Sequence, residues 1–127
     1  MKRETLKVIS DELEALGINY QFMEWIGKPK YPYFTGEYQE IEPFNEDGMQ
    51  ENTFILDGFA RGEMGFVLLE KAKETISKAF PKTEGKVLKT TKGTVIIYYA
   101  SGQSIPTESS DLKRMQINLT VKEWSVE

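Results

Sequence analysis

The segment Tyr31–Pro43, YPYFTGEYQEIEP, decides which kind of fold the chain can form. It contains four aromatic residues and three glutamates, a combination found both in ligand pockets and in strands. Prolines bound its extended part, Tyr33–Glu42, and the turn-forming residues Asn45–Gly48 separate that part from a second apolar run, Asn52–Ala60. We therefore predict a β-hairpin in which aromatic side chains face apolar neighbours and the glutamates stay in water.

Two amphipathic helices are predicted on either side of the hairpin. In Lys2–Leu16 the apolar residues recur every three or four positions, and Gly17 follows as a stop signal. The segment GFARGEMGFVLLEKAKETISKAF has the same spacing in its later part, and Pro81 ends that helix. The residues that define the two apolar faces are Leu6, Ile9, Leu13 and Leu16 in the first helix, and Leu69, Ala72, Ile76 and Ala79 in the second.

Three further segments have strand character. Asn19–Ile26 is rich in aromatic residues, and Gly93–Ala100, GTVIIYYA, is a β-branched and aromatic run that predicts a central strand buried on both faces. Met115–Val121 alternates strictly between apolar and polar residues, which predicts a strand with one dry face and one wet face. The intervening segment 101–111, SGQSIPTESSD, has the composition of a loop.

The predicted order is helix, three strands, helix and two strands. Two helices are enough to cover one face of a sheet of about five strands. We therefore expect an α+β two-layer sandwich with a mixed or mainly antiparallel sheet. The 127 residues fit a single domain, 1–127, with one modest core.

Composition narrows the classes of function. The net charge of −4, with no dense Lys/Arg cluster, disfavours a protein that grips nucleic acid through phosphates. The chain has no cysteine, so neither disulfides nor thiolate metal sites are available. The N-terminal segment MKRETLKVISDEL mixes charges among its apolar residues, which predicts neither a signal peptide nor a membrane span. We expect a protein that is made and used in solution.

The sequence does not indicate an enzyme. The chain has no histidine, so the usual general base and the common nucleophile–histidine pairs are missing. The glycines of GFARGEMG do not follow a nucleotide-binding pattern, and no cofactor motif is present. The one alternative is a carboxylate enzyme holding a divalent metal through Glu40, Glu42 and Asp47. We predict no enzyme, no cofactor and no metal site.

Charge is distributed unevenly along the chain. Residues 1–63 contain thirteen acidic and six basic side chains, and residues 64–127 contain seven and ten. Either these are solvated loops with a chance bias, or acidic and basic surfaces meet between copies of the protein. The candidate interface residues are the acids Glu37, Glu40, Glu42, Glu46 and Asp47 and the bases Lys82, Lys86, Lys89 and Lys92.

Three segments together carry a resemblance to known proteins: YPYFTGEYQEIEPFNEDGMQENTFILDGFARG, the helix after it, and the closing LKRMQINLTVKEWSV. They resemble minor structural proteins of long-tailed bacteriophages and prophages, in the tail-completion group of tail-terminator and head-tail joining proteins. The resemblance covers about Tyr31–Val126 and has no catalytic signature. It implies an α/β subunit with a mixed sheet that assembles as a ring, commonly a hexamer, capping the tail tube and meeting the head connector. It transfers no residue roles.

The resemblance implies a virion protein that is assembled in the cytoplasm of a host bacterium. Its partners would be copies of itself, the tail-tube protein and the head-connector proteins. No membrane would be involved. DNA would only pass through an acidic bore that repels it. The alternative from a different class is a small peptide- or ligand-binding module that uses an exposed strand edge.

Overall fold

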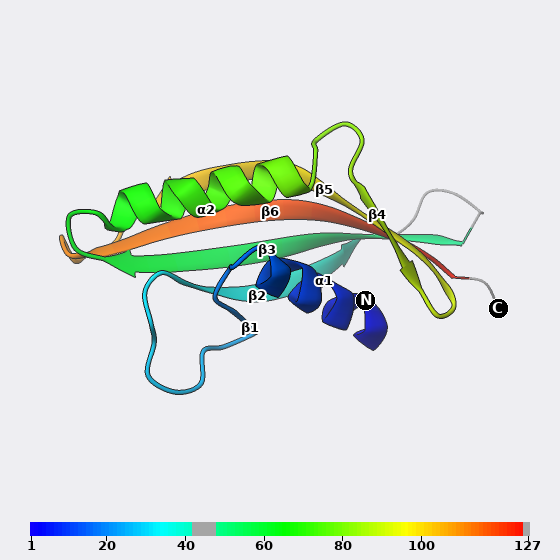
Figure 1. The fold of residues 1–127 in the computed structure, drawn as a ribbon, viewed down its shortest axis with the longest axis horizontal. Helices are drawn as coiled ribbons and strands as arrows, with labels where there is room; N and C mark the ends of the chain where they lie inside the picture. Colours follow the sequence, from blue (N-terminus) through cyan, green and yellow to red (C-terminus); the bar gives the residue numbers. More distant parts are fainter. Residues whose placement is uncertain (42–47, 126–127) are drawn as a thin grey trace.

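The computed structural model describes residues 1–41 and 48–125, and within them the chain forms two helices and six strands (Figure 1). The α+β class predicted from the sequence is confirmed. The elements in chain order are α1 (Arg3–Ala15), β1 (Tyr20–Phe22), β2 (Tyr33–Ile41), β3 (Met49–Arg61), α2 (Gly65–Ala79), β4 (Lys86–Thr90), β5 (Gly93–Ile105) and β6 (Leu112–Ser125).

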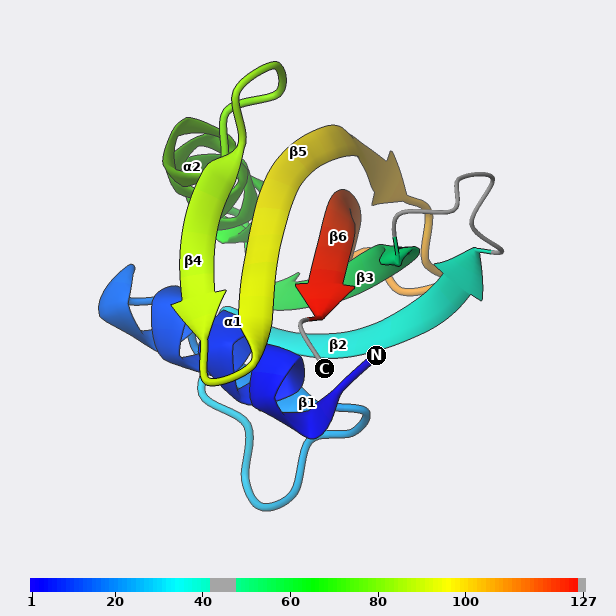
Figure 2. The ribbon, with the colours of Figure 1, turned by 90° about the vertical axis from the view of Figure 1, so that its right-hand side faces the viewer.

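The six strands form one mixed sheet in the order β1-β2-β3-β6-β5-β4. Only the β1–β2 pair is parallel. The sheet curls into a half-barrel (Figure 2), so the prediction of a two-layer sandwich with about five strands is wrong in both layering and strand count. Long strands twist, and a sheet built from strands of 13 and 14 residues accumulates that twist into curvature.

The predicted hairpin is confirmed as β2 and β3. They pair antiparallel from Tyr33 opposite Phe59 to Ile41 opposite Glu51. Gly58 is required in this pair because it lies opposite Phe34: a Cβ at Gly58 would come within 2.3 Å of a ring carbon of Phe34. The hairpin therefore packs its large aromatic side chain against backbone.

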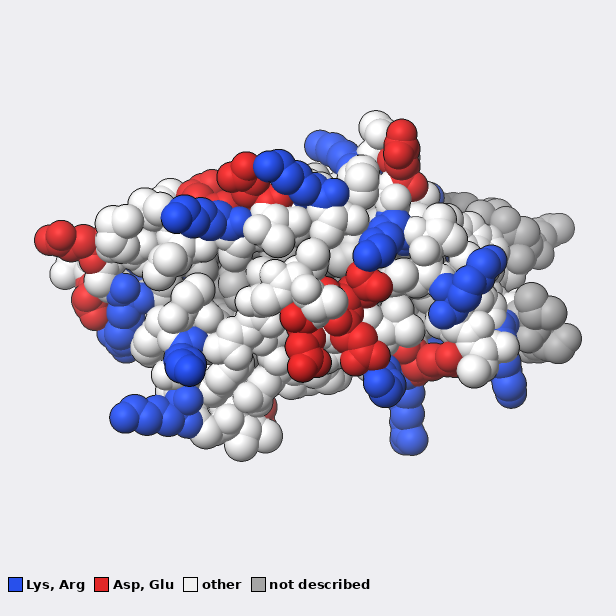
Figure 3. All heavy atoms as spheres, in the orientation of Figure 1, with Lys and Arg blue, Asp and Glu red and all other residues white. Residues whose placement is uncertain are grey.

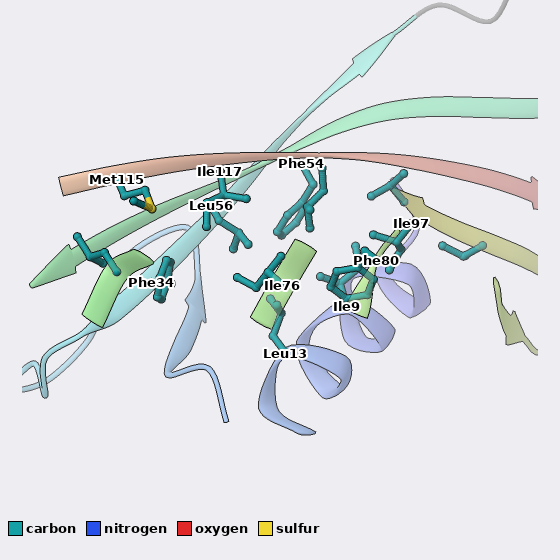
Figure 4. Packing of buried hydrophobic residues seen from close by; sticks show 14 of the residues in the cluster. Ile9, Leu13, Phe34, Phe54, Leu56, Ile76, Phe80, Ile97, Met115 and Ile117 are labelled. Carbon is teal, nitrogen blue, oxygen red and sulfur yellow. The ribbon is translucent and has the colours of Figure 1, made fainter. Parts of the chain in front are cut away.

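The core lies on the concave side of the sheet, where both helices pack (Figure 4). In β6 the side chains at odd positions from Met115 to Glu123 are buried, which confirms the predicted strand with one dry face. From α2 it is Leu69 and Ile76 that are fully buried, and α2 packs on the middle strands β3, β6 and β5. The inward residues of the sheet and the helices thus form a single core.

Helix α1 lies across the opening of the half-barrel and contacts the strands at both edges, β1 and β4. A buried polar cluster fixes it there. The Glu123 carboxylate, 4% exposed, accepts hydrogen bonds from Thr5 Oγ1 at 2.6 Å, Asn52 Nδ2 at 2.8 Å and the backbone N–H of Lys2 at 3.2 Å. A buried carboxylate needs such donors, so helix and sheet specify each other's position.

Three details of the strand prediction are wrong. Strand β4 was not expected because KVLKT offers the core little more than Leu88, and its two adjacent apolar residues stand between Lys86 and Lys89 with no alternating pattern. Residues Ser101–Ile105, predicted as loop, extend β5 past a bulge after Tyr99, since pairing with β6 compensates for their polar composition. The predicted central strand is not buried on both faces: Val95 and Ile97 point inward, whereas the other face is only half covered.

We predict effects of very different size for substitutions at two neighbouring residues of β6. Ile117→Ala removes a fully buried side chain and is expected to lower the free energy of unfolding by about 2–5 kcal/mol. Gln116→Ala changes the outer face and is expected to alter it by no more than about 0.5 kcal/mol. Urea denaturation followed by circular dichroism measures both. Similar losses for the two variants would contradict the assignment of the dry face.

Candidate subunit interface

The candidate interface residues lie on two separate parts of the sheet. Glu37 and Glu40 are exposed on β2, and Lys86 and Lys89 are on β4, the strand at the far end of the sheet. Lys82 precedes β4, and Lys92 is in the turn between β4 and β5. The remaining candidates, Glu42, Glu46 and Asp47, lie outside the described residues.

The acidic part of β2 has an open edge. The neighbouring strand β1 pairs only with Phe34–Gly36, so Glu37–Ile41 has β3 on one side and no described strand on the other. The N–H of Phe34 bonds to Asn19, and the carbonyl of Gly36 accepts from Met23. Because backbone groups alternate along a strand, those of Tyr38 and Glu40 point to the same open side.

The basic strand β4 has an open edge as well. It pairs with β5 from Lys86 to Thr90 and is the last strand in the sheet order. Alternate N–H and C=O groups of such a strand point away from its neighbour. Val87 is 55% exposed beside this edge, and Lys89 is exposed next to it on the same face. The sheet therefore ends on one side in a five-residue strand with two lysines and no acid, and on the other in five residues with two glutamates.

Some of the predicted charges already have partners within the chain. Lys86 Nζ forms an ion pair with Glu12 of α1 at 2.5 Å, and Lys89 Nζ donates to Thr94 Oγ1 at 3.1 Å. Figure 3 shows acidic side chains over α1 beside basic ones over β4. Among the described residues, Lys82, Lys92 and Glu37 take part in no ion pair. Therefore only some of these charged side chains can form ion pairs with a neighbouring copy of the protein.

A second contact joins α1 to the turn between β4 and β5. The Glu4 carboxylate accepts hydrogen bonds from Thr91 Oγ1 at 2.7 Å and from Thr91 N–H at 2.6 Å. These bonds favour the ionised carboxylate, the side-chain bond most strongly, and hold the pKa of Glu4 below its usual value of 4.5. With the Glu12–Lys86 pair, this contact holds the basic edge strand at both of its ends.

An aromatic cluster on the outer face was not foreseen. The rings of Trp25 and Tyr33 have centroids 5.0 Å apart, Tyr33 stacks on Phe59 at 5.1 Å, and the Arg114 guanidinium lies 5.7 Å from the centre of Phe59. Arg114 also pairs with Asp57 at 2.9 Å. The hairpin register, which sets Tyr33 opposite Phe59, was the signal that could have revealed it. The cluster fastens the segment after β1 to the sheet.

The described residues hold no group of three or more carboxylates, histidines or cysteines arranged for a metal. Of the three carboxylates suggested for a metal enzyme, Glu40 alone is described, and it contacts the amine of Met1. Neither described helix has the length and apolarity needed to cross a bilayer. Comparison with known protein families finds no match, and no curated protein is significantly similar in sequence.

The Glu4 contact predicts a specific pH dependence. Because its pKa is lower in the folded than in the unfolded state, Glu4 stabilises the fold above pH 4.5 and loses that effect as the pH falls through the folded value. The urea midpoint of Glu4→Gln should therefore lie below that of the unchanged protein at pH 7, and the difference should shrink below pH 4.5.

Glu14→Gln is the matched control, since it removes the same charge from an exposed position of α1. Its midpoint should follow that of the unchanged protein at each pH. A Glu4→Gln difference that stays constant from pH 7 into the acid range would contradict the proposed bonding to Thr91.

Proposed function

We propose that the protein is a structural subunit of a bacteriophage virion that assembles head to tail into a ring at the end of the tail or at the head-tail junction. The observation that carries the proposal is the pair of open sheet edges of opposite charge. One is the part of β2 with Glu37 and Glu40, and the other is β4 with Lys86 and Lys89. The resemblance stated from the sequence supports the phage setting.

Edge pairing supplies both affinity and direction. Two open strand edges complete each other's backbone hydrogen bonds, as when a peptide adds a strand to a sheet. The acidic edge repels its own copy and attracts the basic edge, so unlike patches meet. A contact between unlike patches is heterologous, and it closes into a ring when the rotation between subunits allows.

The lengths of the edges fit this arrangement. The free part of β2, Glu37–Ile41, has the same number of residues as β4, Lys86–Thr90. Pairing along this length would bring Val87 and Ile41, which are 55% and 36% exposed, into the contact and remove apolar surface from water. The ring would then present its faces to the tail tube and the head connector. In the phage proteins that the chain resembles, such a ring is commonly a hexamer.

A binding module that takes a peptide from an unrelated protein along the same edge is the second candidate. The exposure of Val87 on an edge strand favours it, since such a strand can accept any extended chain. The two functions differ in solution behaviour, because a module stays a monomer when it binds whereas ring subunits bind each other.

Complementation in a phage lacking this gene tests the assembly role. Electron microscopy of the gene deletion should show tails of abnormal length or unjoined heads and tails. Lys89→Glu with Lys92→Glu should reproduce that defect and lower the infectious titre, because both edges become acidic. Adding Glu37→Lys should restore part of the infectious titre, because a positive charge on the β2 edge then meets the acidic β4 edge. Glu40 stays unchanged, since it contacts the amine of Met1 within the chain. Lys86 stays unchanged, since Glu12 pairs with it within the chain.

Lys28→Glu provides a charge-reversal control, because Lys28 is exposed and lies on neither edge. Particles with this substitution should be normal. Normal particles from the deletion would reject the virion role, and a defect that the exchanged charges fail to relieve would reject edge pairing as its basis.

A further inference from the structure

A cleft lies between the C-terminal end of α1, the segment 30–34 and α2. Its volume is about 370 Å³, and it is partly open to solvent. Its apolar walls come from Leu16 and Ile18 after α1, from Tyr31 and Pro32, and from Ala72 of α2, with Phe34 at its base. Phe34 is only 1% exposed, so the base of the cleft belongs to the core.

The rim of the cleft is held in place by hydrogen bonds. The carbonyl of Asn19 accepts from the N–H of Phe34 at 2.7 Å, and its side-chain Nδ2 donates to the carbonyl of Lys30 at 2.8 Å. On the other side, Arg61 Nε donates to the Tyr31 hydroxyl at 3.0 Å. A ligand would therefore meet a preformed shape and lose little free energy to ordering it.

The charges around the cleft have one sign. Lys30 and Lys71 are exposed at its border, and neither forms an ion pair with a described residue. The other two lysines of α2 differ, since Lys73 pairs with Glu70 and Lys78 pairs with Glu74. Of the described residues, those that line the cleft include no carboxylate. An anionic group placed there meets two ammonium groups, which attract it.

We propose that this cleft binds a segment of a partner protein in which a large apolar side chain stands next to a carboxylate. The apolar walls accept the side chain, and Lys30 and Lys71 meet the carboxylate. The volume is near the lower end of the 300–1,000 Å³ typical of ligand sites, which suits one or two side chains. The cleft is partly open to solvent, so a chain can enter and leave it.

This site is independent of the ring interface. None of its lining residues is on the β4 edge or in Glu37–Ile41 of β2. A subunit could therefore pair its sheet edges with neighbours and hold a further protein at the cleft. A variant that no longer pairs its sheet edges can therefore still be tested for binding at the cleft, and a variant that no longer binds at the cleft can still be tested for edge pairing.

Titration by two-dimensional amide NMR tests the proposal with the full chain and two peptides. The probe is acetyl-Asp-Leu-Phe-Glu-amide, and its neutral counterpart is acetyl-Asn-Leu-Phe-Gln-amide. The acidic peptide should shift the resonances of residues 16–19, 30–34 and 71–75. It should bind about tenfold more tightly than the neutral peptide, which corresponds to about 1.4 kcal/mol.

Two variants test the apolar walls and the two lysines of the cleft separately. Ala72→Leu keeps a helix-forming residue but fills the space between the walls, and it should abolish the shifts. Lys30→Glu with Lys71→Glu should reduce the preference for the acidic peptide to about twofold or less. Lys28→Glu, two residues from the cleft, should bind like the unchanged protein. Thermal melting confirms that each variant is folded before it is titrated.

Several results would overturn the proposal. These are no shifts with either peptide at millimolar concentration, equal binding of the two peptides, or shifts that map to another surface. A fourth is saturation by decanoate without binding of the peptides, which would assign the cleft to a small amphipathic acid. Unchanged binding by folded Ala72→Leu would also exclude this cleft as the site.

Discussion

The structure depends on the contact between the buried carboxylate of Glu123 and helix α1. Thr5 donates to this carboxylate from the helix, and Asn52 donates to it from the neighbouring strand β3, so one side chain joins three elements. A buried carboxylate that lost these donors would strongly destabilise the folded state. Few residues form the contact, but the stability of the fold depends on it. It sets α1 across the opening of a sheet that would otherwise have an exposed core.

That placement explains why both sheet edges remain open. A strongly curled sheet can close by pairing its first and last strands, but here a helix stands between them and contacts both. The backbone groups along a helix bond to each other, so α1 cannot pair with a strand edge as another strand would. The outer groups of β4 and of Glu37–Ile41 are therefore left without a described strand partner, and the proposed ring uses what the fold leaves unpaired.

Sequence patterns predicted the elements whose side chains alternate or repeat against the core. Met115–Val121 and the hairpin of β2 and β3 belong to this group, since burial on one face dictates their residues. Strand β4 was missed because its pairing with β5 and not its own composition stabilises it. The Glu12–Lys86 pair and the cleft were also beyond the sequence, because they join residues far apart in the chain. The sequence also does not reveal that Lys73 forms an ion pair whereas Lys71 forms none with a described residue.

Cysteine cross-linking tests most directly whether the acidic edge of one copy pairs with the basic edge of the next. The chain has no cysteine, so single substitutions at Glu37 or Gln39 on β2 and at Val87 or Lys89 on β4 introduce unique thiols on outward-facing positions. Disulfides form only when the Cα atoms lie about 4.4–6.8 Å apart, as in paired strands. Mixing a β2 variant with a β4 variant under oxidation should give disulfide-linked dimers of unlike variants for at least one combination, and few dimers of like variants. Dimers of like variants in equal amount, or no cross-link in any of the four combinations, would contradict the pairing of opposite edges.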